Sequence, residues 1–311
     1  MKTIIFDPIS DEALEYACDK LDEVIKWDEF SDEDLESCEA CIIRVYKLDK
    51  EAIDKMPNLK IIAKHGVGVD SIDLDYAKSK GIRVTNTPTA NSNSVAELII
   101  GLSLAVSRKI VDSHKMVLEG VDRIAPPKLT GFELSGKTLG TIGLGNIGSI
   151  AANTFINGFG MKVLVYDPYI DDSQCAEHGL TKVENLEDLL KESDIINISA
   201  PLTDATENMI AKEQIDLMKK NAIIINAARG KIVNEADLYD ALKAGRIFGA
   251  AMDAFEVEPV KKDNPLLTCD NFIATPHNGA NTVDSLIRMG TGAIDEIVRK
   301  KNGEDNHHVV V

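Results

Sequence analysis

The chain has 311 residues, more than a typical single domain holds, so its length predicts two domains. Asp and Glu outnumber Lys and Arg by 51 to 34, and the net charge of −17 argues against nucleic acid or an anionic membrane as a partner. Hydrophobic residues make up 44% of the chain, enough for ordinary globular cores.

The amino-terminal sequence MKTIIFDPIS has too short an apolar run, Ile4–Phe6, to be a signal peptide. No window approaches the length of a membrane-spanning helix. The five cysteines are an odd count without a secretion signal, which predicts reduced thiols and a cytoplasmic protein. Cys38 and Cys41 form a C-x-x-C with no second Cys or His pair, so no metal site is expected.

Short β-branched runs alternate with helical patterns in the first part of the chain. The expected strands are Thr3–Phe6, Cys41–Val45, Lys60–Lys64 and Ile82–Thr85, and the expected helices are Asp11–Lys20, Asp49–Lys55 and Ser71–Lys80. This βαβ rhythm predicts a mostly parallel sheet with helices on both faces.

A long helical pattern from about Asn91 to Glu119 leads into a second block of strands. These are expected at Lys137–Ile142, Lys162–Tyr166, Asp194–Ile198, Ala222–Asn226, Phe248–Met252 and Asn271–Thr275. Six strands with helices between them match a complete dinucleotide-binding sheet. A last helix, from about Thr282 to Lys300, can pack back on the first block. The sequence therefore predicts an α/β protein with a discontinuous domain, 1–93 plus 285–311, and a second domain, 94–284.

The first strand of the second block runs into the sequence GLGNIG at positions 143–148, a G-x-G-x-x-G pattern that opens a helix. Gly143 permits a tight turn, Gly145 leaves room for a pyrophosphate, and Gly148 lets the helix and the strand pack closely. Backbone N–H groups near Asn146 and Ile147 would bind the phosphates. A dinucleotide is therefore the expected cofactor.

The strand that follows, Lys162–Tyr166, ends at Asp167, which lies 19 residues beyond Gly148. A carboxylate at this place accepts hydrogen bonds from the adenosine ribose hydroxyls and repels the 2′-phosphate of NADP. The predicted cofactor is therefore NAD.

Three residues of complementary chemistry follow three strand ends of the second block: Arg229, Glu258 and His277. Ligands of an open α/β sheet bind beyond the carboxyl ends of its strands. Arg229 can hold a carboxylate with its planar fork, and His277 can donate or accept a proton near neutral pH. Glu258 can bond the His ring and raise its pKa. The set predicts hydride transfer to or from the 2-position of a small 2-keto or 2-hydroxy acid.

Taken together, these motifs resemble the D-isomer-specific 2-hydroxyacid dehydrogenase family over nearly the whole chain. That family includes phosphoglycerate dehydrogenases, hydroxypyruvate and glyoxylate reductases, and D-lactate dehydrogenases. Arg229, Glu258 and His277 match its catalytic Arg, Glu and His. The resemblance implies two Rossmann-like domains, a flavodoxin-like substrate domain and a doubly wound NAD-binding domain, with a cleft between them. It also implies D stereochemistry and a homodimer.

Further site residues follow from the same resemblance. The sequence GVGVDSID at positions 66–73 looks like the family's substrate loop, with Val67 and Gly68 binding the substrate carboxylate, and NTP at positions 86–88 looks like the approach to its interdomain helix. Arg229 and His277 are further substrate contacts, and Arg44 is a candidate contact because of its place at the end of a strand. The implied cofactor contacts in the loops after the strands are Ala200, Pro201, Thr206, Ala227, Asp253, Gly279 and Ala280.

One feature departs from the family and two alternatives stay open. Many members carry a Trp where this chain has GVDR at positions 120–123, and its only Trp is Trp27. A short phosphoglycerate dehydrogenase without a regulatory domain is one alternative, since Arg44 with Lys64 or His65 could form the cationic patch that a phosphate needs. The other is an NADH-sensing co-repressor-like protein, which would need no catalytic triad.

A productive complex would need groups from both domains, so we expect the cleft to close about hinges near Asn93–Val95 and Asn281–Asp284. The long helix expected at Ser94–Glu119 carries apolar residues at helical spacing, more than one sheet face needs. These are Val95, Leu98, Ile99, Leu102, Ala105 and Val106. Part of this surface is expected to pair with a second subunit across a two-fold axis.

Overall fold

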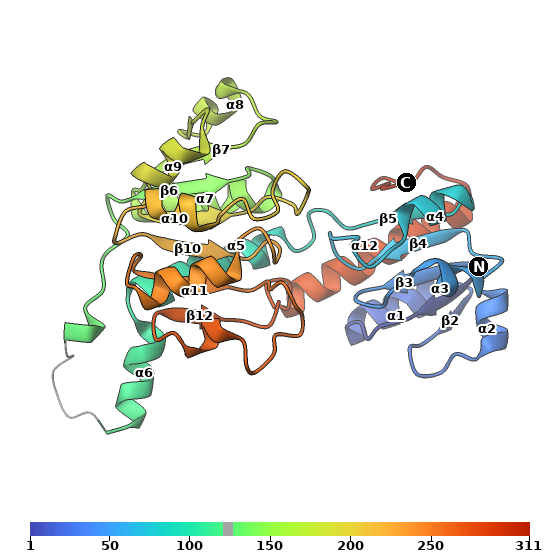
Figure 1. Ribbon diagram of the computed structural model, residues 1–311. Helices are drawn as coiled ribbons and strands as arrows, with labels where there is room; N and C mark the ends of the chain where they lie inside the picture. The colour runs from blue at the N-terminus through green and yellow to red at the C-terminus, as the bar shows by residue number, and fades with distance from the viewer. Residues whose placement is uncertain (121–126) are drawn as a thin grey trace. The chain divides into compact units, whose positions relative to one another are not determined.

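The computed structural model describes residues 1–120 and 127–311, which form two compact units (Figure 1). Unit 1 is built from two stretches, Met1–Ser94 and Ala280–Val311. Unit 2 is the stretch between them, Val95–Gly279. Each unit is a parallel sheet covered by helices on both faces, as the βαβ rhythm of the sequence predicts.

The sheet of unit 1 has the strand order β2-β1-β3-β4-β5, with every pair parallel. Its strands are β1 (Lys2–Ile5), β2 (Glu23–Ile25), β3 (Ala40–Ile43), β4 (Ile61–Lys64) and β5 (Arg83–Thr85). An order of 2-1-3-4-5 is that of a flavodoxin-like sheet, in which ligands bind at the carboxyl ends of the strands. Arg44 and Gly66–Gly68 lie just beyond two of these ends.

Helices cover both faces of this sheet. They are α1 (Asp11–Lys20), α2 (Asp32–Ser37), α3 (Lys50–Asp54), α4 (Leu74–Ser79) and α12 (Val283–Asn302). Alternate residues of one strand point to opposite faces, so Ile5 packs against α1 and α12 whereas Ile4 packs on the side of α2, α3 and α4. The final helix therefore returns the chain to the first block, where it completes the core.

The sheet of unit 2 has the order β12-β11-β10-β9-β6-β7-β8, again with every pair parallel. Its strands are β6 (Thr138–Ile142), β7 (Lys162–Tyr166), β8 (Thr181–Lys182), β9 (Ile195–Ile198), β10 (Ile223–Asn226), β11 (Gly249–Met252) and β12 (Phe272–Ala274). The order reverses between β6 and β9, and this switch point is where a doubly wound sheet binds its dinucleotide. The predicted fold class is confirmed.

The helices of unit 2 also divide between the two faces. They are α5 (Ser92–Ser107, which begins in unit 1), α6 (Ile110–Leu118), α7 (Asn146–Phe159), α8 (Asp172–Glu177), α9 (Leu186–Glu192), α10 (Lys212–Leu217) and α11 (Glu235–Lys243), with short 3-10 turns η1 (Pro127–Leu129) and η2 (Pro265–Thr268). Residues of α5, α7 and α8 share one core, and those of α9, α10 and α11 share the other. Ile142, at the end of β6, is buried in the second of these cores.

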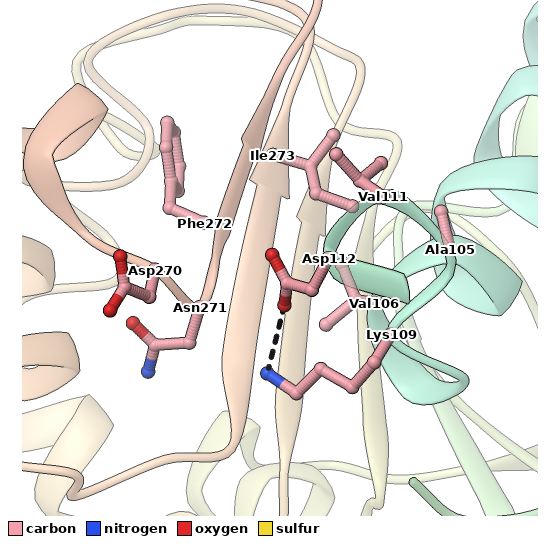
Figure 2. Close-up of a pocket in the computed structure, with 9 residues that line it drawn as sticks. All are labelled: Ala105, Val106, Lys109, Val111, Asp112, Asp270, Asn271, Phe272 and Ile273. Carbon is pink, nitrogen blue, oxygen red and sulfur yellow. Dashed lines mark ion pairs between the residues drawn. The ribbon is translucent and has the colours of Figure 1, made fainter. Parts of the chain in front are cut away.

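The prediction of a single long helix at Ser94–Glu119 is wrong, because the structure has two helices there, α5 and α6. Lys109 adopts a left-handed backbone with φ of 53°, and the Ser107 carbonyl accepts a hydrogen bond from the Phe132 N–H at 2.9 Å instead of continuing the helix. The Lys109 ammonium lies 4.7 Å from the centroid of the Phe248 ring. It also lies 3.9 Å from the Asp112 carboxylate (Figure 2). The helix thus ends because of contacts with Phe132 and Phe248, which lie further along the chain, and not because of its local sequence.

Among the described residues, two short strands, β2 and β8, and one short α-helix, α2, were not expected from the sequence. Both strands lie at sheet edges and carry few buried side chains, so their hydrophobic signal is weak. Of the GVDR segment at positions 120–123, only Gly120 is among the described residues. Within 1–120 and 127–311, the structure contains no helix that is both long and apolar enough to cross a membrane.

Candidate active site

The glycine turn after β6 has the geometry that a dinucleotide requires. Gly143 has φ of 88°, and a Cβ atom there would lie 2.8 Å from the Ser199 carbonyl oxygen. A Cβ at Gly148 would lie 2.5 Å from the Gly143 oxygen, whereas one at Gly145 would meet nothing within 4 Å. The turn is therefore closed on the protein side and open where a pyrophosphate would approach α7, whose first residues are Asn146 and Ile147.

Asp167 lies next to this turn, one residue beyond the end of β7. One of its carboxylate oxygens accepts the Leu144 N–H at 2.9 Å, and the other accepts the Tyr169 N–H at 2.9 Å. Each oxygen keeps a lone pair for a further donor. The position fits an acid that binds ribose hydroxyls.

The loop after β9 carries three of the predicted cofactor contacts. A Cβ at Gly143 would lie 3.0 Å from the Ala200 nitrogen, so Ala200 borders the glycine turn. The Thr206 hydroxyl donates to the Pro201 carbonyl at 2.7 Å and accepts the Thr203 N–H at 2.8 Å. Thr206 thus closes its own loop, which fixes the backbone beside the switch point.

Arg229 is held by a turn that sequence reasoning did not identify. Asn226, fully buried at the end of β10, accepts the Ala228 N–H at 3.1 Å and donates to the Arg229 carbonyl at 2.8 Å. Ala227 is half-buried in the same turn. A Cβ at Gly230 would lie 2.0 Å from the Phe255 carbonyl oxygen, so the turn presses against the loop that leads to Glu258. A polar residue ending an apolar strand was the only sequence signal for this role of Asn226.

Glu258 and His277 form a direct pair. The His277 Nδ1 donates to the Glu258 Oε2 at 2.7 Å, and the other oxygen of Glu258 accepts the Phe255 N–H at 2.9 Å. The Glu258 side chain is 36% exposed and the His277 side chain is 45% exposed, so the pair is accessible to a ligand. With Nδ1 bonded to the carboxylate, Nε2 is the ring atom available for proton transfer.

The charges around this pair shift its pKa values. The hydrogen bond to Glu258 raises the pKa of His277 above its ordinary value, although burial and the Arg229 charge oppose the change. Burial raises the pKa of Glu258, but the bonds from His277 and Phe255 and the nearby positive charges outweigh it, so that pKa is lowered. Arg229 is thus close enough to act electrostatically on both partners.

Asp253 organises the loop on which His277 lies. It is 1% exposed; one oxygen accepts the Thr275 hydroxyl at 2.6 Å and the Asn278 N–H at 2.9 Å, and the other accepts the Gly279 N–H at 2.8 Å. His277 itself has φ of 50°, a left-handed conformation that is costly unless the surroundings impose it. Ala280, the next predicted cofactor contact, is the first residue of the second stretch of unit 1.

The predicted substrate contacts Arg44, Val67 and Gly68 belong to unit 1. Arg44 is half-buried, and its N–H donates to the Asp7 carboxylate at 2.7 Å. The same oxygen of Asp7 accepts the next two backbone N–H groups, so it fixes the start of this loop. Val67 and Gly68 are half-buried in the loop after β4.

The two other residues suggested for a phosphate site are less suited to it. The Lys64 ammonium is buried and donates to the Arg44 carbonyl at 2.5 Å and to the Ser71 hydroxyl at 3.3 Å. Burial and the Arg44 charge lower the pKa of His65 to about 4. His65 is therefore uncharged at neutral pH.

Comparison with known proteins agrees with this geometry. Residues 100–279 match the model of the D-isomer specific 2-hydroxyacid dehydrogenase, NAD binding domain. Over 316 residues the chain is 42% identical to a D-3-phosphoglycerate dehydrogenase of Methanocaldococcus jannaschii, covering 100% of this chain but 59% of that protein. It is 41% identical to a hydroxypyruvate reductase of Thermotoga maritima over 82% of this chain and 81% of the relative.

A solved structure is similar along its full length. The crystal structure of a D-lactate dehydrogenase with NAD+ from Lactobacillus jensenii superposes with a TM-score of 0.83 and 31% sequence identity, covering 100% of both chains. The matched domain and the glycine turn make a nicotinamide adenine dinucleotide the cofactor of unit 2. The chain belongs to the D-isomer-specific 2-hydroxyacid dehydrogenase family.

Proposed function

We propose that the protein is an NAD-dependent dehydrogenase that transfers a hydride between the nicotinamide and C2 of a small D-2-hydroxy or 2-keto acid. The observation that carries the proposal is the His277–Glu258 pair at 2.7 Å, within electrostatic reach of Arg229. The pair and Arg229 belong to the same unit as the glycine turn. The proposed catalytic side chains and the cofactor site thus lie at the same edge of one sheet.

In the reducing direction, bound NADH would supply the hydride to C2. The C=O π electrons then move onto the substrate oxygen, which takes the proton from the His277 Nε2. Glu258 stabilises the imidazolium before transfer and keeps its ring oriented. Arg229 binds the substrate carboxylate and polarises the carbonyl, because its fork offers parallel N–H donors. Oxidation of the hydroxy acid runs these steps in reverse, with neutral His277 as the base.

The structure favours an unphosphorylated substrate over the phosphoglycerate alternative. Lys64 is bonded within its own loop and His65 is uncharged, so of the three suggested residues only Arg44 offers an available cation. One half-buried guanidinium is a weak site for a doubly charged phosphate. The identity to a D-3-phosphoglycerate dehydrogenase keeps the alternative worth testing.

A panel of 2-keto acids at constant NADH tests both statements. We expect glyoxylate, pyruvate or hydroxypyruvate to be reduced with a higher kcat/KM than phosphorylated hydroxypyruvate. A phosphorylated substrate with the highest kcat/KM would reverse the substrate assignment. If the protein oxidises NADH with none of these acids, the proposed activity is wrong and the co-repressor-like alternative is favoured.

We also keep the homodimer and the cytoplasmic location as proposals. The predicted dimer surface on α5 is largely used by unit 2 itself, since Val95, Ile99 and Leu102 are buried against its sheet. Apolar side chains of α6 supply better support, because Val117 is 72% and Leu118 is 73% exposed. Light scattering should then give about twice the 33.9 kDa of one chain. Closure of a cleft between the domains stays a prediction.

A further inference from the structure

The segment after β5 contacts the loop after β4 through four hydrogen bonds, one of which runs from the Thr87 hydroxyl to the Gly66 carbonyl at 3.3 Å. The Thr87 N–H donates to the Gly66 carbonyl at 3.0 Å, and the Gly66 N–H donates to the Thr87 hydroxyl oxygen at 3.0 Å. The Asn86 side-chain amide donates to the Val67 carbonyl at 2.9 Å. Two successive carbonyl groups of the loop therefore point toward Asn86 and Thr87.

This contact sets the direction of the next N–H groups. In a trans peptide the C=O and the following N–H point in opposite directions. Because the Gly66 and Val67 carbonyls face Asn86 and Thr87, the Val67 and Gly68 N–H groups face the other way. Neither N–H donates to an acceptor within residues 1–120 and 127–311. Adjacent N–H groups aimed to one side form a site for an anion.

We propose that Asn86 is a positioning residue for the reaction: its amide holds the Val67 carbonyl so that the Gly68 N–H, beside the Val67 N–H, faces the substrate carboxylate. The inference rests on the proposed function, since it needs a carboxylate substrate at this loop. Asn86 touches no reacting atom, and its effect passes through the loop backbone. Its removal should therefore weaken substrate binding more than it changes turnover.

The backbone of Asn86 is held independently of its side chain. Its N–H donates to the His308 carbonyl at 3.1 Å, next to an antiparallel contact between Val309 and Thr85. The segment carrying His308 is fixed by Glu296, which is 3% exposed and accepts the Asn306 amide at 2.8 Å. Substitution of the Asn86 side chain thus leaves the backbone bonds of this segment in place, and the substrate loop is the part that loses a bond.

Asn86→Ala tests the proposal, with Asn58→Ala as a matched control. Asn58 lies in the same unit and also donates its amide to a carbonyl, that of Glu36 at 2.7 Å, but it is exposed. Steady-state kinetics at saturating NADH should give Asn86→Ala a KM for the 2-keto acid about threefold to tenfold above the parent, with kcat within about threefold. The Kd for NADH should stay within about twofold, and Asn58→Ala should match the parent throughout.

A second variant and a measurement on the unchanged protein guard against a folding defect. Asn86→Asp places a carboxylate oxygen against the Val67 carbonyl and should raise KM more than Asn86→Ala does. In the parent bound to NADH, oxamate should slow hydrogen exchange at the Val67 and Gly68 amides. A parental KM in Asn86→Ala, or no added protection at these amides, overturns the inference. A parent that reduces no 2-keto acid overturns the proposed function instead.

Discussion

A single methyl group added at Gly230 should disturb the two loops that carry Arg229 and Glu258. An alanine Cβ there would lie 2.0 Å from the Phe255 carbonyl oxygen and 2.6 Å from the Glu256 nitrogen. Real Cβ contacts stay above 3.0 Å, so one loop must move by about 1 Å. The obstacle is backbone, which cannot rotate away as a flexible side chain does.

The size of the effect follows from that displacement. Overpacking of this kind costs about 1–3 kcal/mol, which for a domain of this size lowers Tm by roughly 2–12 °C. A displacement of about 1 Å in the reacting geometry costs on the order of 100-fold in rate. Gly230→Ala should therefore lose on the order of 100-fold in kcat/KM. The Kd for NADH should change much less than kcat/KM does, because the glycine turn at Gly143 is untouched, although Ala227 lies in the turn next to Gly230.

Gly101→Ala is the matched control, because it adds the same methyl group within the same unit. Gly101 is exposed on α5, and a Cβ there would meet nothing within 4 Å. Alanine in a helix should stabilise the protein by about 0.5–1 kcal/mol and leave kcat/KM unchanged. Differential scanning fluorimetry and initial-rate assays measure both variants. A Gly230→Ala protein with parental kcat/KM would refute the close approach of the two loops as a requirement for activity.

Three further substitutions test the assigned roles. His277→Ala should lower turnover by a factor on the order of 100 or more with a near-parental Kd for NADH, and full turnover would remove His277 from the mechanism. Glu258→Gln removes the charge that raises the pKa of His277. Reduction needs the protonated ring, so the activity of the parent falls as the pH rises through that pKa. In Glu258→Gln this fall in kcat/KM should occur at lower pH. A fall at the same pH as in the parent would contradict the pairing. Asp167→Ala should narrow the preference for NADH over NADPH. A parent that already prefers NADPH would contradict the prediction that the Asp167 carboxylate repels the 2′-phosphate.

The positions of the three proposed catalytic residues were predictable because they follow from topology. Parallel strands present their carboxyl ends at one edge, so Arg229, Glu258 and His277 had to lie along that edge once their strands were identified. The contact between Glu258 and His277 also followed, since an acid and a His at adjacent strand ends can bond. Gly143 and Gly148 were predictable for another reason, because only glycine fits turns that approach the backbone so closely.

The break between α5 and α6 was not predictable, and the reason is physical. Apolar residues continue at helical spacing across Arg108 and Lys109, and no Gly or Pro marks an end. The helix ends because Phe132, far along the chain, bonds the Ser107 carbonyl, and because the Phe248 ring stabilises the Lys109 ammonium. A pattern in the local sequence cannot indicate a contact with a residue that belongs to another element.

Asp253 illustrates how a predicted residue can gain a second role in the structure. The sequence suggested a cofactor contact, and the carboxylate accepts three hydrogen bonds from the loop that carries His277. An ionised carboxylate has about four acceptor sites. Within residues 1–120 and 127–311, one oxygen of Asp253 accepts the Gly279 N–H and no other donor, which leaves one acceptor site on that oxygen. Asp253 can therefore accept one N–H from a bound cofactor while it holds the loop. Cofactor binding and the placement of His277 would then depend on the same buried charge, and Asp253→Asn should impair both together.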